Sequence, residues 1–157
     1  MTPSPTVAIA AGGVLLLATG IDLKSRTIPD ALPLLLTGLA LVATWRGWHA
    51  VTWAQLGIGL GVSFAIGAAL FYAGAMGGGD AKLCAGLGAV CGWPHILEVL
   101  FATALAGGVL ALWARRRGQE SLPFAPAFAS GYLATLGIAW SMPPTTGLWH
   151  LITGRPV

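Results

Sequence analysis

Charged side chains are scarce in this sequence: they make up 8% of its 157 residues, whereas hydrophobic residues make up 56%. A soluble domain carries about 25% charged residues. So few charged groups cannot cover a surface that faces water, whereas a surface that faces lipid needs none. The mean hydropathy of +0.80 agrees with this reasoning. The composition therefore excludes an ordinary soluble domain and indicates an integral membrane protein surrounded by lipid.

The basic residues are few, and the chain's net charge of +3 could suggest a nucleic-acid-binding surface. They lie at the ends of apolar segments, where membrane topology accounts for them. We therefore expect no nucleic-acid partner. The first twenty residues contain no Lys or Arg, so the positively charged start of a cleaved signal peptide is missing. We expect the first apolar segment to be a retained membrane span.

Metal-binding side chains are few as well. Cys84 and Cys91 are seven residues apart, so they share a helix face about 10 Å apart, too far for a disulfide. Two cysteines cannot build a structural zinc site alone. His49, His95 and His150 show no ligand spacing. We expect no metal and no cofactor, and we interpret the cysteines as small packing residues.

Long apolar segments are what the sequence does contain. Transmembrane helices need roughly 17 to 25 apolar residues, and the candidates are 7–21, 28–45, 51–76, 81–93, 95–114 and 122–141. The segment 81–93 is short. Either it is a short, deeply set helix, or 81–114 forms a broken hairpin around Pro94. The pattern predicts an all-α, polytopic membrane protein, with about six transmembrane helices in a single domain over 1–157.

Positive charges orient these spans. Six of the eight basic residues fall on one side if the chain crosses the membrane six times: Lys24, Arg26, Lys82, Arg115, Arg116 and Arg117. Only Arg46 and Arg155 fall on the other side. Because cytoplasmic loops carry an excess of Lys and Arg, we expect the loops 22–27, 77–82 and 115–121 in the cytoplasm and both termini outside.

Small residues indicate how the spans pack. Gly57 and Gly61, and likewise Gly88 and Gly92, are four residues apart, a spacing that lets helix backbones approach closely. Glycine is also simply common in membrane helices. These motifs therefore support packing and nothing chemical.

Two acidic residues carry the chemistry. Asp22 closes the first span, and Asp80 opens the fourth after three glycines. Acids at the membrane edge are functional candidates, because they are costly there unless they face the bundle interior or a water-filled cavity. Two neighbouring carboxyl groups share one proton and can act as base and acid on one water molecule. The plain alternative is that each is a helix cap or loop charge. Glu98 and Glu120 are interpreted as structural.

The sequences around both acids resemble motifs of a known family. Asp22-Leu-Lys-Ser-Arg26-Thr-Ile28-Pro29-Asp30 is similar to the D-x-x-x-R-x-I-P-N signature of type IV prepilin and preflagellin leader peptidases. Met76-Gly77-Gly78-Gly79-Asp80-Ala81-Lys82-Leu83 is similar to their G-x-G-D-x-K-L motif. A third match, Leu122-Pro123-Phe124-Ala125-Pro126-Ala127, is similar to their proline-rich entry into the last span. The resemblance covers about residues 7 to 141.

The resemblance implies a function. It implies an intramembrane aspartyl endopeptidase in the plasma (inner) membrane, which cuts the basic leader from prepilin-like or preflagellin-like substrates at the cytoplasmic face. Asp22 and Asp80 match the two catalytic aspartates. The other candidate site residues, expected to bind substrate, are Arg26, Asp30, Gly77, Gly78, Gly79 and Lys82. Arg26 and Lys82 are more simply explained as topology-setting charges.

The chain departs from the family pattern at two points. Position 30 is Asp where the family usually has Asn; both residues cap helix N-termini well, but the extra charge puts a substrate contact there in doubt. The paired C-x-x-C insert that long family members carry, linked to N-methylation, is missing from this sequence. The chain is thus similar to the short, cleavage-only class, which includes the peptidases of Flp/Tad pilus systems.

The same residues are also compatible with two other functions. A small proton-coupled transporter or channel would also use membrane acids, but its site would lie near the midplane, often between inverted repeats. An inactive assembly subunit is a further alternative. If the two acids form a pair, the dipoles of their own helices place the shared proton mainly on Asp22, which ends a helix, and leave Asp80 as the base.

Overall fold

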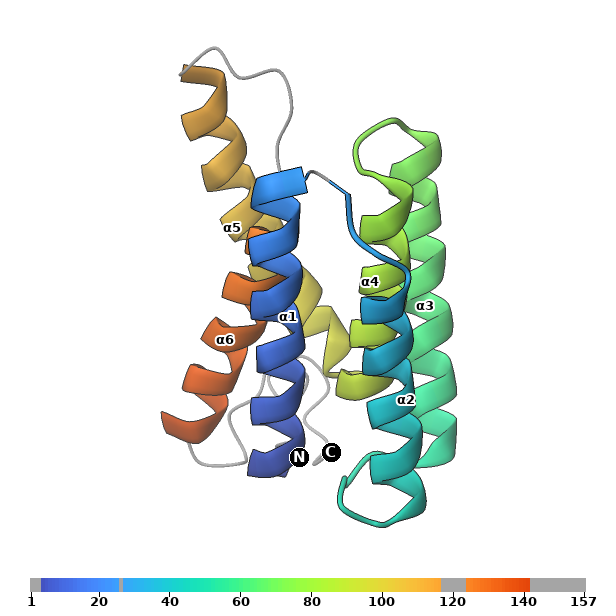
Figure 1. Ribbon diagram of the computed structural model, residues 1–157. Coiled ribbons are helices and arrows are strands. Elements are labelled where there is room, and N and C mark those ends of the chain that lie inside the picture. The colour runs from blue at the N-terminus through green and yellow to red at the C-terminus, as the bar shows by residue number, and fades with distance from the viewer. Residues whose placement is uncertain (1–3, 26, 117–123, 142–157) are drawn as a thin grey trace.

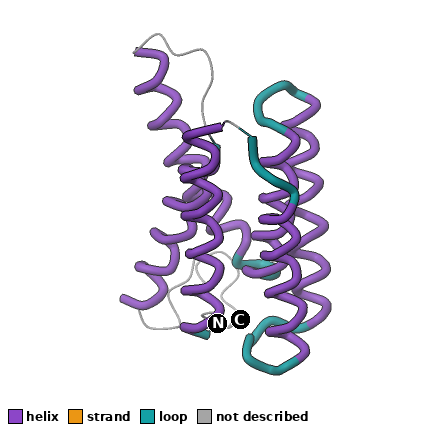
Figure 2. Tube along the Cα trace, viewed as in Figure 1, coloured by secondary structure: helices purple, strands orange, loops and turns teal. Residues whose placement is uncertain are grey.

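The structure is a computed structural model that describes residues 4–25, 27–116 and 124–141. Within these ranges the chain forms only helices and loops (Figures 1 and 2). The helices are α1 (Pro5–Ser25), α2 (Ala31–Trp45), α3 (Trp53–Tyr72), α4 (Gly78–Cys91), α5 (Ile96–Arg116) and α6 (Ala125–Ser141). They follow the predicted segments in number and order, which confirms the all-α fold.

Three of these helices are long and apolar enough to cross a membrane by themselves: α1, α3 and the portion Ile96–Trp113 of α5. Helices α2 and α6 are apolar but shorter. Many large apolar side chains on the outer faces of the helices are exposed, such as Ile9, Leu34 and Val109. An outer surface of this kind is stable in lipid and not in water. The molecule is a membrane helical bundle.

The six helices form two groups of three (Figure 1). Helices α2, α3 and α4 form one group, and α1, α5 and α6 form the other. The groups meet mainly where α1 contacts α2 and where α4 contacts α5. The buried core spans both groups and includes Leu15 of α1, Leu36 of α2, Leu87 of α4 and Tyr132 of α6. One group therefore carries Asp22 and the other carries Asp80.

Glycines bring α3 and α4 into close contact. A Cβ added at Gly59 would collide with the Gly88 carbonyl oxygen and lie 2.9 Å from the Gly92 Cα. The prediction that Gly88 and Gly92 allow close packing is therefore confirmed. A Cβ at Gly57 or Gly61 would meet nothing within 4 Å. For that pair the packing prediction is wrong within this chain, because the motif faces away from the neighbouring helices.

The structure decides between the two interpretations of the fourth apolar segment, which forms helix α4. It has 14 residues, a length of about 21 Å, against about 30 Å for the hydrocarbon core. Most of its residues from Ala81 onward are buried. It ends before Gly92, which has a φ of 66°, and α5 begins at Ile96. The fourth segment is thus a short helix set deeply among the others, separate from α5.

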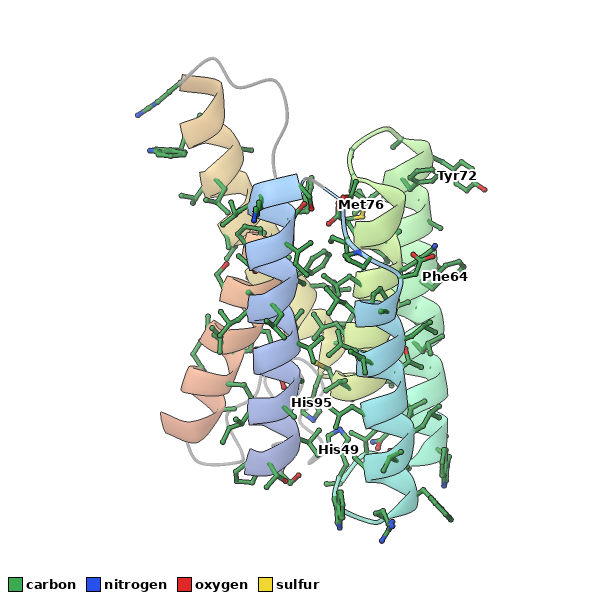
Figure 3. The ribbon with its side chains drawn as sticks, viewed as in Figure 1. His49, Phe64, Tyr72, Met76 and His95 are labelled. Carbon is green, nitrogen blue, oxygen red and sulfur yellow. The ribbon has the colours of Figure 1, made fainter. Side chains whose placement is uncertain are left out.

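The loop between α2 and α3 lies at the end of the bundle opposite Met76 (Figure 3). His49 of this loop is buried, and its Nε2–H donates a hydrogen bond to the Val90 carbonyl near the end of α4. Burial lowers the pKa of the His49 imidazole below its usual 6.5, so the ring is a neutral structural link at pH 7. Trp45 and Trp48 are exposed beside Arg46, as expected of an interfacial aromatic belt.

Candidate functional site

The last turn of α1 and the first turn of α4 lie at the same end of the bundle (Figure 1). Asp22 belongs to the first and Asp80 to the second. The two carboxyl groups are close enough for their charges to interact. Residues 58 positions apart in the sequence thus supply two acids to one place. The structure brings together the pair that the sequence singles out, each from a different group of three helices.

Asp22 is buried, with 5% of its surface exposed. Its Oδ2 accepts a hydrogen bond of 3.1 Å from the backbone N–H of Ala125. Ala125 is the first residue of α6, and the first N–H groups of a helix have no partner within it. Pro126 has no N–H at all. Asp22 therefore acts as a cap for α6, where the positive end of that helix dipole stabilises a negative charge.

Asp80 has different surroundings. Its Oδ2 accepts a hydrogen bond of 3.2 Å from the backbone N–H of Gly77, the residue that caps α4. Its Oδ1 is buried without a hydrogen-bond partner in the described part of the chain. A buried carboxylate oxygen without a donor is costly when charged. Asp80 is thus positioned by one oxygen, while its other oxygen is buried without a described donor.

The glycines before Asp80 serve close approach rather than unusual backbone angles. The glycines with positive φ among the described residues are Gly47, Gly74 and Gly92, so conformational freedom does not explain the run at 77–79. A Cβ at Gly79 would lie 3.1 Å from the Ile28 Cβ and 3.2 Å from the Ile28 carbonyl oxygen. The segment between α1 and α2 therefore lies directly against the first turn of α4.

Asp30 and Lys82 bind each other. The Lys82 Nζ lies 2.7 Å from one carboxylate oxygen of Asp30 and 2.9 Å from the other. Asp30 occupies the N-cap position of α2, but its side chain makes no capping hydrogen bond. Helix α2 thus begins after Asp30, but the capping hydrogen bond expected of this residue is missing, because its carboxylate is turned toward α4.

Some of the remaining sequence-based candidates lie outside the described residues, and the others lie within them. Arg26 and most of the loop 115–121 lie outside the described residues. Gly77 and Gly78 lie where the motif places them, at the cap and first residue of α4. Cys84 and Cys91 are buried and free, as expected of packing residues. No group of three or more His, Cys, Asp or Glu side chains among the described residues could hold a metal ion.

Sequence reasoning missed two contributors to the site. One is the Ala125 amide, and the other is Ile28, which covers Gly79. Both belong to motifs that the sequence analysis describes for other reasons: the proline-rich entry into α6 and the I-P pair after α1.

Asp22 and Asp80 together provide two unequal carboxyl groups, a combination that can activate a water molecule and protonate a leaving group.

Comparisons with known proteins show which proteins the chain is similar to. The prepilin leader peptidase/N-methyltransferase of Burkholderia pseudomallei, strains 1026b and K96243, is 37% identical over 143 residues, which cover 82% of this chain and 46% of that protein. The protein of the same name from Xanthomonas campestris pv. campestris is 34% identical over 140 residues, covering 83% of this chain and 47% of its own length. The chain thus spans about half the length of these curated relatives.

No solved structure matches the chain significantly. A model of the type IV leader peptidase family matches residues 9–112, which include both Asp22 and Asp80. The relatives named above are similar over most of this chain. The chain therefore belongs to the type IV leader peptidase family.

Proposed function

We propose that the protein is a membrane-embedded aspartic endopeptidase that cleaves the basic leader peptide from prepilin-like substrates. The observation that carries this proposal is the meeting of Asp22 and Asp80 at one end of a membrane bundle, in surroundings that make the two acids unequal. The relatives are prepilin leader peptidase/N-methyltransferases, and their name supplies the substrate class. The proposed catalytic residues are Asp22 and Asp80, and the reaction needs no cofactor.

The contacts favour Asp22 as the ionised base. Its carboxylate receives the Ala125 N–H and lies at the positive end of the α6 dipole. Asp80 lacks a donor for its buried Oδ1, which favours the protonated form there. This division is the reverse of the one that follows from the dipoles of α1 and α4 alone, because that argument left α6 out.

The proposed steps conserve every proton. The Asp22 carboxylate accepts a proton from water as the water oxygen bonds to the scissile carbonyl carbon, and the Asp80 carboxylic acid gives its proton to the carbonyl oxygen. The tetrahedral diol then collapses: the C–N bond breaks, Asp22 gives its proton to the leaving amine, and Asp80 recovers a proton from a hydroxyl group. Each acid thus returns to its starting state.

The site is proposed to face the cytoplasm from the plasma membrane. Lys24 and Lys82 lie at the same end of the described bundle as the two acids, whereas Arg46 lies at the other end. This distribution supports the orientation, since cytoplasmic ends carry the excess of Lys and Arg. A basic leader would reach the two acids from that side.

The test is cleavage by the purified protein in proteoliposomes. The substrate is a peptide with a basic leader, a glycine and a hydrophobic helix, followed by mass spectrometry. We expect cleavage after the glycine, and a loss of at least about a thousandfold in kcat for Asp22→Asn and for Asp80→Asn with the fold retained, since each acid is indispensable. Full activity in either variant would refute the paired-acid mechanism.

A transporter would give a different result in the same preparation. It would leave the peptide intact and would instead move protons or a solute across the vesicle membrane. No described feature favours that alternative, because both acids lie at one end of the bundle and not near its middle.

A further inference from the structure

The ion pair between Asp30 and Lys82 has no role in the chemistry proposed above. It joins the residue before α2 to the second turn of α4, with both carboxylate oxygens within 2.9 Å of the Lys82 Nζ. The side chains are 66% and 53% exposed. An exposed ion pair contributes little to stability. Stability alone therefore does not explain the pair.

A second contact lies beside the ion pair. Ile28 packs over Gly79 so closely that a Cβ on the glycine would lie 3.1 Å from the Ile28 Cβ. Gly79 and Lys82 flank Asp80 along α4. The segment 27–30 is thus held to α4 on both sides of the catalytic Asp80, by packing on one side and by charge on the other.

The same segment is covalently continuous with Asp22. One residue separates it from the end of α1 in the sequence, and Asp22 lies in the last turn of α1. Asp22 belongs to the group α1, α5 and α6, whereas Asp80 belongs to the group α2, α3 and α4. The distance between the acids therefore depends in part on how the segment 27–30 is attached to α4, beside the contacts of α1 with α2 and of α4 with α5. Errors of about 1 Å in such a distance can lower a rate about a hundredfold.

We propose that Asp30 and Lys82 are positioning residues: their ion pair fixes the first turns of α4 against the segment 27–30 and so sets Asp80 relative to Asp22. This inference rests on the proposed peptidase function and assigns both residues a role other than binding substrate. Position 30 is Asp in this chain, and only a charged carboxylate can form this pair with lysine. An asparagine there would leave Lys82 without its partner charge.

The test is a double-mutant cycle on turnover of the same peptide in proteoliposomes. Asp30→Asn and Lys82→Gln should each lower kcat about tenfold and leave KM unchanged within about twofold, because misplaced acids slow the chemical step. The double variant should be no slower than either single variant, since each change removes the same contact. Lys82→Arg, which can still pair with both oxygens, should retain wild-type turnover.

The matched control is Lys24→Gln, which removes an exposed lysine from the last turn of α1 at the same end of the bundle. It should change kcat by less than about twofold. Additive losses in the double variant, or loss of activity in Lys82→Arg, would overturn the proposal. So would a rise in KM for Asp30→Asn that disappears when the leader lysines of the peptide become glutamines, because Asp30 would then be binding the substrate.

The two hypotheses fail in different ways. If the wild-type protein never cleaves the peptide, the proposed function is wrong. If the wild-type protein cleaves it and Asp30→Asn and Lys82→Gln both turn over at the wild-type rate, the peptidase assignment stands and only the positioning role is wrong.

Discussion

Asp22 and Asp80 are the same residue type in two unlike environments. Asp22 is buried and receives a backbone N–H at the start of α6, whereas Asp80 presents a buried oxygen that no described donor reaches. Such inequality is what an acid–base pair requires, because one group must hold a proton while the other gives it up. The difference arises from neighbours far away in the sequence, not from the aspartates themselves.

The sequence predicted which two acids lie close together better than it predicted their surroundings. The motifs around Asp22 and Asp80 pointed to both acids directly. The contact with Ala125 joins residues 103 positions apart, and no local rule of helix capping could place it there. Asp30 shows the same limit, because its carboxylate turns away from α2, which local capping preferences assign to it, and toward Lys82 of α4.

The close contact between Gly79 and Ile28 predicts how a substitution at Gly79 changes activity. In Gly79→Ala the new methyl group lies 3.1 Å from the Ile28 Cβ, so Ile28 must give way by a few tenths of an ångström and move the segment 27–30 against α4. We expect kcat for the peptide to fall about tenfold. The control is Gly38→Ala on α2, whose methyl group meets nothing within 4 Å. Equal activity in the two variants would contradict this reasoning.

At the scale of elements, α4 is the helix that the sequence described least well. Its apolar run is short, and periodicity alone could not separate a short helix from half of a hairpin. Tertiary contacts decide the matter: glycines on α3 and α4 let α4 pack closely enough to be buried along most of its length. The long segments needed no such help, since their hydropathy alone predicted α1, α3 and α5.

The two faces of α3 differ in how closely they are packed, which predicts different stabilities for two glycine variants. A methyl group at Gly59 would strike the backbone of α4 at Gly88 and Gly92. We expect Gly59→Ala to lower the free energy of unfolding by about 1–3 kcal/mol, the usual cost of overpacking. Gly57→Ala adds a methyl group where nothing lies within 4 Å, so it should be neutral or stabilising by up to about 1 kcal/mol.

Unfolding of both α3 variants can be followed by circular dichroism in detergent micelles. Cleavage activity after reconstitution is the control for the fold. If Gly57→Ala proved as destabilising as Gly59→Ala, the assignment of inner and outer faces to α3 would be wrong.

At the scale of the whole molecule, the site lies where the two groups of three helices meet. Each group contributes one acid, and the segment 27–30 connects them. Hydropathy and charge predicted how many helices there are and which ends lie together. They could not predict the grouping, because it depends on which small and large side chains fit one another across helices.

The arrangement of charge predicts the orientation of the whole bundle. Thr27 lies at the end that carries Lys24, Lys82 and both acids, whereas Ala50 lies in the loop at the opposite end. Both are exposed. With cytoplasmic ends richer in Lys and Arg, we expect Thr27→Cys to face the cytoplasm and Ala50→Cys to face outward, each made in a background of Cys84→Ala and Cys91→Ala.

A membrane-impermeant maleimide applied to intact cells distinguishes the two ends. Ala50→Cys should be labelled at once, whereas Thr27→Cys should be labelled only after the membrane is permeabilised. The variants control for each other, because both carry one exposed cysteine on the same bundle. The reverse pattern would place the acids outside the cell, where a leader still attached on the cytoplasmic side could not reach them, and would refute both the orientation and the proposed site of cleavage.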